Sequence, residues 1–201
     1  MKKTYKTKME NIIKDYNNNL KFNKYKLYGD YHHRWYETKD SYRNNVNFLK
    51  SWVKEKNVID IGAGDGVITS LLGIRGIDIN TDAIKCANLR GIKIDLGSVY
   101  KLPYKDQEFE SALVTDTIEH LEFLDNALQE IRRVIQKYLY TNIIIRDNFK
   151  EPEHYHRWTV EQFINDIERN GFVLEGKPIA QFKRYYFKFK KNGKFDNNIL
   201  Y

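Results

Sequence analysis

Short runs of β-branched and other apolar residues alternate with helix-like segments from residue 57 onward, and this alternation limits the fold more than any other feature. The sequence predicts strands at 57–61, 74–80, 91–99, 111–116 and 140–147, and helices at 66–73, 81–91, 122–139 and 159–171. Strands that alternate with helices form βαβ units around a parallel sheet. Two further strands, 172–176 and 184–191, have no helix between them and should pair antiparallel. We therefore expect an α/β fold with helices on both faces of one sheet.

Local signals support these helices. Thr81 and Thr159 are the expected N-caps of two of them, which end at Gly91 and Gly171. The segment 122–139 carries a 3.6-residue apolar stripe, formed by Leu124, Leu128, Ile131 and Ile135.

The residues before the first strand have a different character. Residues 1–23 are polar, and the following segment to residue 56 predicts one or two helices with breaks near Gly29 and Thr38 and an N-cap at Ser41. Residues 1–45 are expected to form a helical arm or lid, and residues 46–201 the main domain. The lid is rich in aromatic and imidazole side chains: Tyr25, Tyr28, Tyr31, His32, His33, Trp35, Tyr36 and Tyr42.

Composition limits the cellular location and the binding partners that we expect. The chain has 201 residues, of which 41% are hydrophobic, so a core is feasible, but no apolar run reaches the ~20 residues that cross a bilayer. No apolar signal segment follows the basic N-terminus, and Cys86 is the single cysteine. We expect a soluble, cytoplasmic protein of unspecified oligomeric state. The net charge of +7 admits RNA as a partner, although the lysines are scattered.

The stretch VIDIGAGDG, residues 58–66, places a glycine-rich turn between the first strand and the first helix of the main domain. Its G-x-G-x-G spacing differs from the G-x-G-x-x-G of dinucleotide sites. Asp60 and Asp65 would repel a pyrophosphate and attract a cation, which favours a nucleoside that carries an ammonium group. Asp78 ends the second strand, 18 residues after Asp60, near the spacing at which a carboxylate accepts hydrogen bonds from ribose.

These blocks, together with GSVYKLPYKDQEFESALVTDTIEHL, resemble the class I S-adenosylmethionine-dependent methyltransferases, of the type 11 and 12 kind. The resemblance implies a Rossmann-like seven-stranded sheet with the last strand antiparallel, and S-adenosylmethionine as cofactor. It assigns the amino-acid part of the cofactor to Asp60, Gly62, Ala63 and Gly64, and the ribose to Asp78. It assigns the adenine to Ile79, Ser98 and Val99, with backbone contacts from Thr115. Apart from the resemblance, we expect Arg43 of the lid to meet the cofactor carboxylate.

A second group follows the fourth and fifth expected strands. Asp116, Glu119 and His120 would share one face if helical, and His154 and His156 lie in a loop that opens on the same sheet edge. Three interpretations remain open: His120 or His156 acts as a general base; Glu119, His120 and a loop histidine bind a metal, as in the somewhat similar small-RNA 2′-O-methyltransferases; or the segment is structural. We expect His120 and His156 to be catalytic and no metal to be present.

The leading functional interpretation is methyl transfer to an O or N atom of a small-molecule or sugar-like acceptor. The alternatives are an RNA 2′-O-methyltransferase and a non-catalytic cofactor-binding subunit. A nicotinamide oxidoreductase fits less well, because the third glycine has the wrong spacing and Asp65 would face the phosphates.

Overall fold

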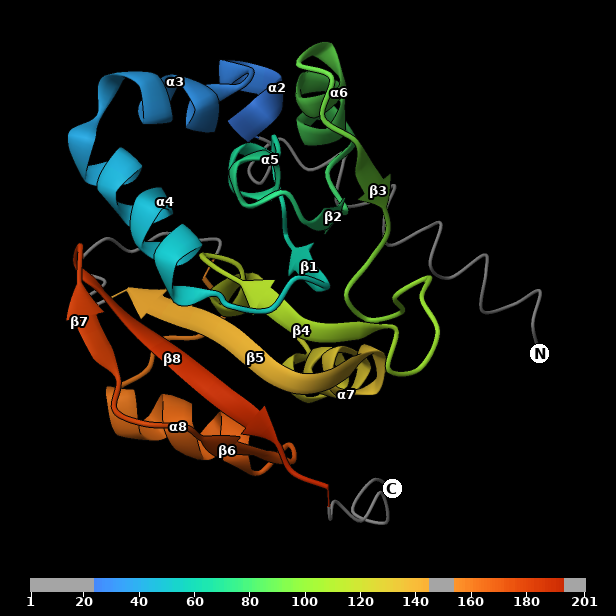
Figure 1. Cartoon of the computed structure of the whole chain (residues 1–201), viewed down its shortest axis with the longest axis vertical. Coiled ribbons are helices and arrows are strands. Elements are labelled where there is room, and N and C mark those ends of the chain that lie inside the picture. The colour runs from blue at the N-terminus through green and yellow to red at the C-terminus, as the bar shows by residue number, and fades with distance from the viewer. Residues whose placement is uncertain (1–23, 145–153, 194–201) are drawn as a thin grey trace. The chain divides into compact units, whose positions relative to one another are not determined.

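The computed structural model describes residues 24–144 and 154–193 (Figure 1). Contacts group the chain into two compact units, Met1–Pro103 and Tyr104–Tyr201. The expected arm over residues 1–23 and the end of the strand expected at 140–147 lie outside the described residues. No helix within the described ranges is long and apolar enough to cross a membrane.

The first unit is a three-stranded parallel sheet with helices. In chain order it contains α2 (Lys24–Tyr28), α3 (Tyr31–Thr38), α4 (Asp40–Trp52), β1 (Val58–Ile61), α5 (Val67–Leu72), β2 (Arg75–Asp78), α6 (Thr81–Leu89) and β3 (Ile94–Leu96). The strand order is β3-β2-β1, with Ile59 opposite Arg75 and Gly76 opposite Ile94. Fully buried aliphatic side chains, including Ile59 and Ile77, form its core. The βαβ alternation predicted for this region is confirmed.

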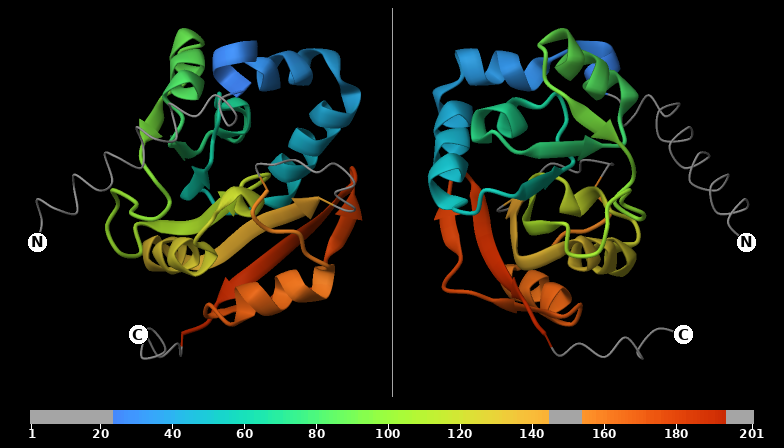
Figure 2. Two further views of the ribbon diagram at one scale, coloured as in Figure 1. Left: turned by 180° about the vertical axis from the view of Figure 1, so that it is seen from behind. Right: turned by 45° about the vertical axis from the view of Figure 1, so that its right-hand side comes forward.

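The helices that precede β1 pack on the glycine-turn side of this unit. Helix α2 contacts α6, and α3 contacts both α4 and α5, as both views in Figure 2 show. Three helices occupy the segment for which one or two were expected. The predicted breaks are confirmed, because α2 ends before Gly29 and α3 ends at Thr38. Ser41 is not an N-cap, however, since α4 already begins at Asp40.

The N-caps of α6 and of the later helix α8 can be compared with the predicted ones. Asn80, not Thr81, caps α6, because its side-chain oxygen accepts hydrogen bonds from the amides of Asp82 and Ala83. Thr159 caps α8 (Val160–Glu168) as predicted, and Gln162 completes a capping box. Both segments contain a threonine near the start of the helix, but in α6 the preceding Asn80 occupies the N-cap position.

The second unit combines parallel and antiparallel pairing. It contains β4 (Phe109–Val114), η1 (Ile118–His120), α7 (Leu124–Val134), β5 (Ile135–Ile144), α8, β6 (Phe172–Leu174), β7 (Ile179–Gln181) and β8 (Arg184–Lys191). β5 runs parallel to β4 and antiparallel to β8, and β8 also pairs antiparallel with β6 and β7. The antiparallel final strands are confirmed, whereas the three-residue β7 was not predicted.

One predicted boundary is wrong. The helix expected at 122–139 ends at Val134, and the chain becomes β5 at Ile135. Ile135 continues the apolar stripe of the helix, but it pairs with Phe109 of β4 and is fully buried. Strand pairing on both sides of β5 therefore overrides a helical periodicity that local sequence alone supports.

Candidate cofactor and acceptor sites

The glycine stretch forms a tight turn from β1 into α5. The amides of Gly62 and Ala63 both donate to the carbonyl of Ile77, at 3.0 and 3.1 Å, which fixes the turn against β2. Gly64 and Gly66 have positive φ angles of 57° and 79°, a region that side chains disfavour. A Cβ atom on Gly64 would overlap the hydroxyl oxygen of Tyr25. The turn thus needs its glycines both for conformation and for space.

Asp78 lies at the carboxyl end of β2 and faces this turn. Its carboxylate accepts hydrogen bonds from the amides of Gly64 and Asn80, each at 2.7 Å, and the residue is buried. Burial raises the pKa of Asp78, while these amide donors act in the opposite direction. Each carboxylate oxygen has more than one acceptor site, so both can still accept from a ligand hydroxyl. The amides hold the carboxylate in place for such a ligand.

Asp60 is enclosed in the protein interior within β1. It is 2% exposed, and its carboxylate accepts a hydrogen bond from the hydroxyl of Thr69 in α5 at 2.6 Å. Burial raises the pKa of Asp60 to about 7, with a further contribution from the charge of Asp78 and an opposing one from Thr69. Asp60 therefore stands close to its protonation midpoint at neutral pH, and its bond to Thr69 links β1 to α5, the two elements that the turn joins.

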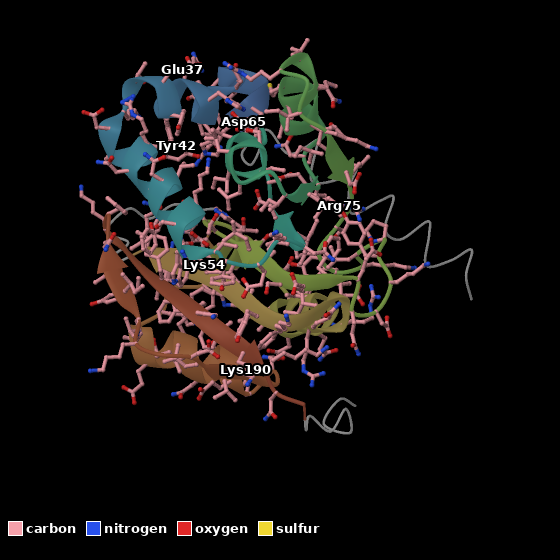
Figure 3. All side chains as sticks on the ribbon, viewed as in Figure 1. Glu37, Tyr42, Lys54, Asp65, Arg75 and Lys190 are labelled. Carbon is pink, nitrogen blue, oxygen red and sulfur yellow. The ribbon has the colours of Figure 1, made fainter. Side chains whose placement is uncertain are left out.

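Asp65 has backbone partners that the sequence did not predict. Its carboxylate accepts hydrogen bonds from the backbone amides of His32 and His33, at 3.1 and 3.3 Å, in the first turn of α3. The ring of His33 also bonds to the Asp65 carbonyl, at 3.1 Å. In Figure 3, Asp65 lies beside α5, with Tyr42 and Glu37 on the neighbouring helices. The carboxylate of Asp65 therefore accepts hydrogen bonds from amides at the N-terminus of α3, the positive end of the helix dipole.

An aromatic cluster joins these helices to the turn. Tyr31 packs against Tyr25, His32 and Trp35, and the ring of Tyr42 stacks on His32 at 5.7 Å. The hydroxyl of Tyr25 bonds to Nδ1 of His32 at 2.8 Å and accepts from the amide of Asp65 at 3.2 Å. Burial, followed by the charges of neighbouring groups, raises the pKa of Tyr25, so its phenol stays protonated. The sequence indicated an aromatic lid but did not single out Tyr25.

The remaining predicted cofactor residues of the first unit differ in their surroundings. Ile79 and Val99 are half-buried, and Ser98 is buried with its hydroxyl accepting from the amide of Tyr100 at 3.3 Å. The guanidinium of Arg43 contacts the carboxylate of Asp40 at 2.5 Å and the carbonyl of Glu37. Ser98 thus has a local partner, and Arg43 is held by its own helical segment.

In the second unit, β4 leads into a turn held by an ion pair. Thr115, predicted to contact the cofactor through its backbone, is buried directly after the strand. Asp116 follows with a φ of 49°, and Arg184 of β8 binds its carboxylate with two bonds of 2.7 and 2.8 Å. The amide of Asp116 also donates to Asn142 at 2.8 Å. No sequence signal pointed to Arg184, because 68 residues separate the two partners.

The histidines come together around η1. Asp116 lies outside this short 3₁₀ turn, so the shared helical face expected for Asp116, Glu119 and His120 does not form. Glu119, His120 and His154 instead form a cluster whose candidate ligand atoms all lie within 4.8 Å of one another. His156 is placed differently: its Nε2 donates to the carbonyl of Leu121 at 2.8 Å, and its ring stacks on Trp158 at 4.7 Å. This geometry makes His156 a support for the loop.

Comparison with known proteins identifies the fold. A possible histamine N-methyltransferase of Thermotoga maritima superposes with a TM-score of 0.69 at 20% identity, over 84% of this chain and 98% of that protein. Magnesium protoporphyrin IX methyltransferase of Synechocystis, solved with S-adenosylhomocysteine bound, superposes with a TM-score of 0.67 at 13% identity. The match covers 91% of this chain and 100% of that protein. The chain therefore has the Rossmann-like α/β fold of the class I methyltransferases, as predicted.

Comparison of the sequence supports the same class of enzyme. Residues 59–138 match the family described as "Methyltransferase domain". The protein MJ1123 of Methanocaldococcus jannaschii is 26% identical over 170 residues, which cover 83% of this chain and 82% of that one. The predicted class, a methyltransferase that uses S-adenosylmethionine, is confirmed.

Proposed function

We propose that this methyltransferase transfers the methyl group to an O or N atom of a small-molecule acceptor, sugar-like molecules included. The observation that carries the cofactor half of this proposal is the buried carboxylate of Asp78, bonded at 2.7 Å to the amide of Gly64 in the side-chain-free turn. We assign the ribose hydroxyls to Asp78 and the amino-acid part of the cofactor to the turn of Gly62, Ala63 and Gly64. Asp60 supports that turn from the interior.

The distribution of charge supports a small acceptor over RNA. Affinity for nucleic acid depends on basic side chains that are available to phosphates. Many basic residues here are matched with acidic neighbours instead: Lys85 with Asp82, Arg90 with Asp30, Arg133 with Glu130 and Asp106, Lys137 with Glu110, Arg169 with Asp166, Arg184 with Asp116, and Lys188 with Glu175. The structural neighbours named above are also methyltransferases of small molecules by their descriptions.

The acceptor half of the proposal centres on His120. Methyl transfer from a sulfonium needs an aligned nucleophile and, for a hydroxyl or ammonium acceptor, the removal of its proton. His120 is half-buried, and its ring meets that of His154 edge-on at 4.7 Å. We assign the handling of the acceptor proton to His120 rather than to His156, because Nε2 of His156 already donates to a backbone carbonyl. Helices α2 to α4, with Tyr25 on Gly64, act as the lid over the cofactor turn.

A labelled-methyl screen tests this function. S-adenosylmethionine with a radiolabelled methyl group is incubated with the protein and with pools of small amines, small hydroxyl compounds, sugars, or RNA. We expect label in a small-molecule pool, and a His120→Gln variant should lose ~10²–10⁴-fold in kcat while its affinity for S-adenosylhomocysteine is unchanged. Glu122→Gln, which changes an exposed carboxylate just after η1, serves as the control with normal kcat. Label that enters RNA alone would refute the small-molecule acceptor, and full activity of His120→Gln would refute the role of His120.

A further inference from the structure

Strand β3 has an open outer edge as far as the described residues show. It is the last strand of the sheet in the first unit, and β2 is the strand that pairs with it (Figure 1). The amide of Gly97 donates to the carbonyl of Asp78 in β2, at 3.0 Å. Because backbone groups alternate between the two edges of a strand, Asp95 also bonds to β2, whereas Ile94 and Leu96 direct their N–H and C=O groups outward. An outward row of this kind is a template for another strand.

A second copy of β3 matches these outward groups when the two strands run antiparallel about Ile94. A two-fold axis at Ile94 sets this residue opposite its own copy and sets Ile92 opposite the partner's Leu96. All three residues direct their backbone groups outward, so each facing pair can exchange two N–H···O bonds. An axis between two residues would instead set outward groups opposite groups that already bond to β2. The matching contact uses the same patch on both chains, which is the geometry of an isologous dimer.

The charges along the strand select this register. With the axis at Ile94, Lys93 lies opposite the partner's Asp95 on each side of the axis, at positions where facing side chains are closest. An axis at Lys93 or at Asp95 also matches the outward groups, but it sets a charge opposite its own copy, which is destabilising. Lys93 is exposed, and Asp95 is half-buried, with its carboxylate 3.3 Å from the guanidinium of Arg75. Opposite charges therefore face each other in the register centred on Ile94.

The other face of β3 adds apolar surface to this edge. Leu96 is 51% exposed and Ile92 is half-buried, and the register places them opposite each other between the two chains. Helix α6 covers that face, because Ala87 packs with Ile94 in one apolar cluster. Leu89, the last residue of α6, is 89% exposed. A second strand beside β3 would remove part of this apolar surface from water, which favours association.

We propose that β3 is a homodimer interface, at which two copies of the chain pair residues 92–96 antiparallel and join their sheets. The inference is independent of the proposed function, because it rests on the backbone, charges and exposure of this edge. The paired strands are short, so the dimer is weak and depends on concentration, as small interfaces do. Pairing also covers an edge that would otherwise be open to unrelated strands.

Two charge reversals test the interface. Lys93→Glu sets like charges at both facing positions of a homodimer, and Asp95→Lys does the same, whereas a mixture of the two variants restores opposite charges at both positions. Sedimentation velocity is measured between about 10 µM and about 1 mM, a range suited to weak association. We expect a wild-type dimer, at least ~10-fold weaker association of each variant alone, and a dimer with one copy of each variant in the mixture. Lys56→Glu, which changes an exposed lysine before β1, is the matched control and should dimerise normally.

Hydrogen exchange of the wild type tests the pairing without any variant. The amides of Ile94 and Leu96 should become protected as the protein concentration rises, whereas the amide of Asp95, which already faces β2, should not change. Four outcomes overturn the proposal: a wild type that stays monomeric over the whole range, variants that associate as the control does, a mixture that forms no dimer, or outward amides that do not respond to concentration. A monomer whose outward amides are always protected would show that another segment covers this edge.

Discussion

Two carboxylates on neighbouring strands, Asp60 and Asp78, have different tasks at the glycine turn. Asp78 accepts from the amides of Gly64 and Asn80 and keeps lone pairs for a ligand. Asp60 has a hydroxyl partner, Thr69, and lies in the interior, so its pKa rises to about 7. The same residue type is therefore a buried titratable group in β1 and the proposed ligand contact in β2.

The raised pKa of Asp60 should make stability depend on pH. Between about pH 4 and pH 7 the folded protein keeps this proton while the unfolded chain has lost it, so the free energy of unfolding falls as pH rises through that window. Asp60→Asn resembles the protonated form and does not titrate. We expect the stability of Asp60→Asn, relative to wild type, to increase by roughly 3 kcal/mol between pH 5 and pH 8.

Urea unfolding of both proteins at the two pH values measures this difference. Glu37→Gln, which changes an exposed carboxylate of α3, is the control and should keep a constant offset from wild type. A difference between Asp60→Asn and wild type that does not change with pH would contradict the assignment.

At the scale of elements, the attachment of α3 to the turn before α5 is the least expected feature. Asp30, the residue before α3, makes no side-chain cap bond, and Asp65 from a distant part of the chain accepts from the first-turn amides. Helix α3 and the glycine turn are therefore connected by a cap that Asp65 supplies from another element. A change at the turn should consequently alter α3.

Removal of that cap should loosen α3. We expect Asp65→Ala to lower the free energy of unfolding by ~0.5–2 kcal/mol, the usual effect of losing a cap side chain. Hydrogen exchange should accelerate at the amides of His32 and His33, which lose their acceptor. Asp40→Ala, at the exposed start of α4, is the control and should leave those two amides protected. Unchanged exchange in Asp65→Ala would show that the cap does not hold the helix.

The sequence predicted the elements better than their connections. Alternating apolar runs and glycine stops identified the strands and helices around the turn, because these signals are local. The boundary at Ile135 failed, since the pairing of β5 with both β4 and β8 decides it. The same limit applied to the candidate sites. The sequence indicated Asp78 as a candidate, because its spacing to the turn is a local signal. The contacts of Tyr25 with Gly64 and of Arg184 with Asp116 join residues about 40 and 68 positions apart, and no local signal predicts them.

For the whole molecule, the proposed cofactor and acceptor roles fall in different compact units. The first unit, Met1–Pro103, contains the glycine turn, Asp78 and helices α2 to α4, and the second contains the cluster of Glu119, His120 and His154. The assigned cofactor contacts are concentrated in the first unit and the assigned acceptor chemistry in the second. Variants in one cluster should therefore affect one ligand and spare the other, and this separation makes the proposed roles testable independently.

The most direct test of the account is calorimetric titration of the wild-type protein and Asp78→Ala with S-adenosylhomocysteine and with NAD⁺. We expect S-adenosylhomocysteine to bind the wild type, NAD⁺ to give no binding heat, and Asp78→Ala to lose ~1–3 kcal/mol of binding free energy for S-adenosylhomocysteine, the usual effect of losing a buried charged acceptor. Binding of NAD⁺ that S-adenosylhomocysteine does not displace, or equal affinity of wild type and Asp78→Ala, would contradict the assignment of this turn.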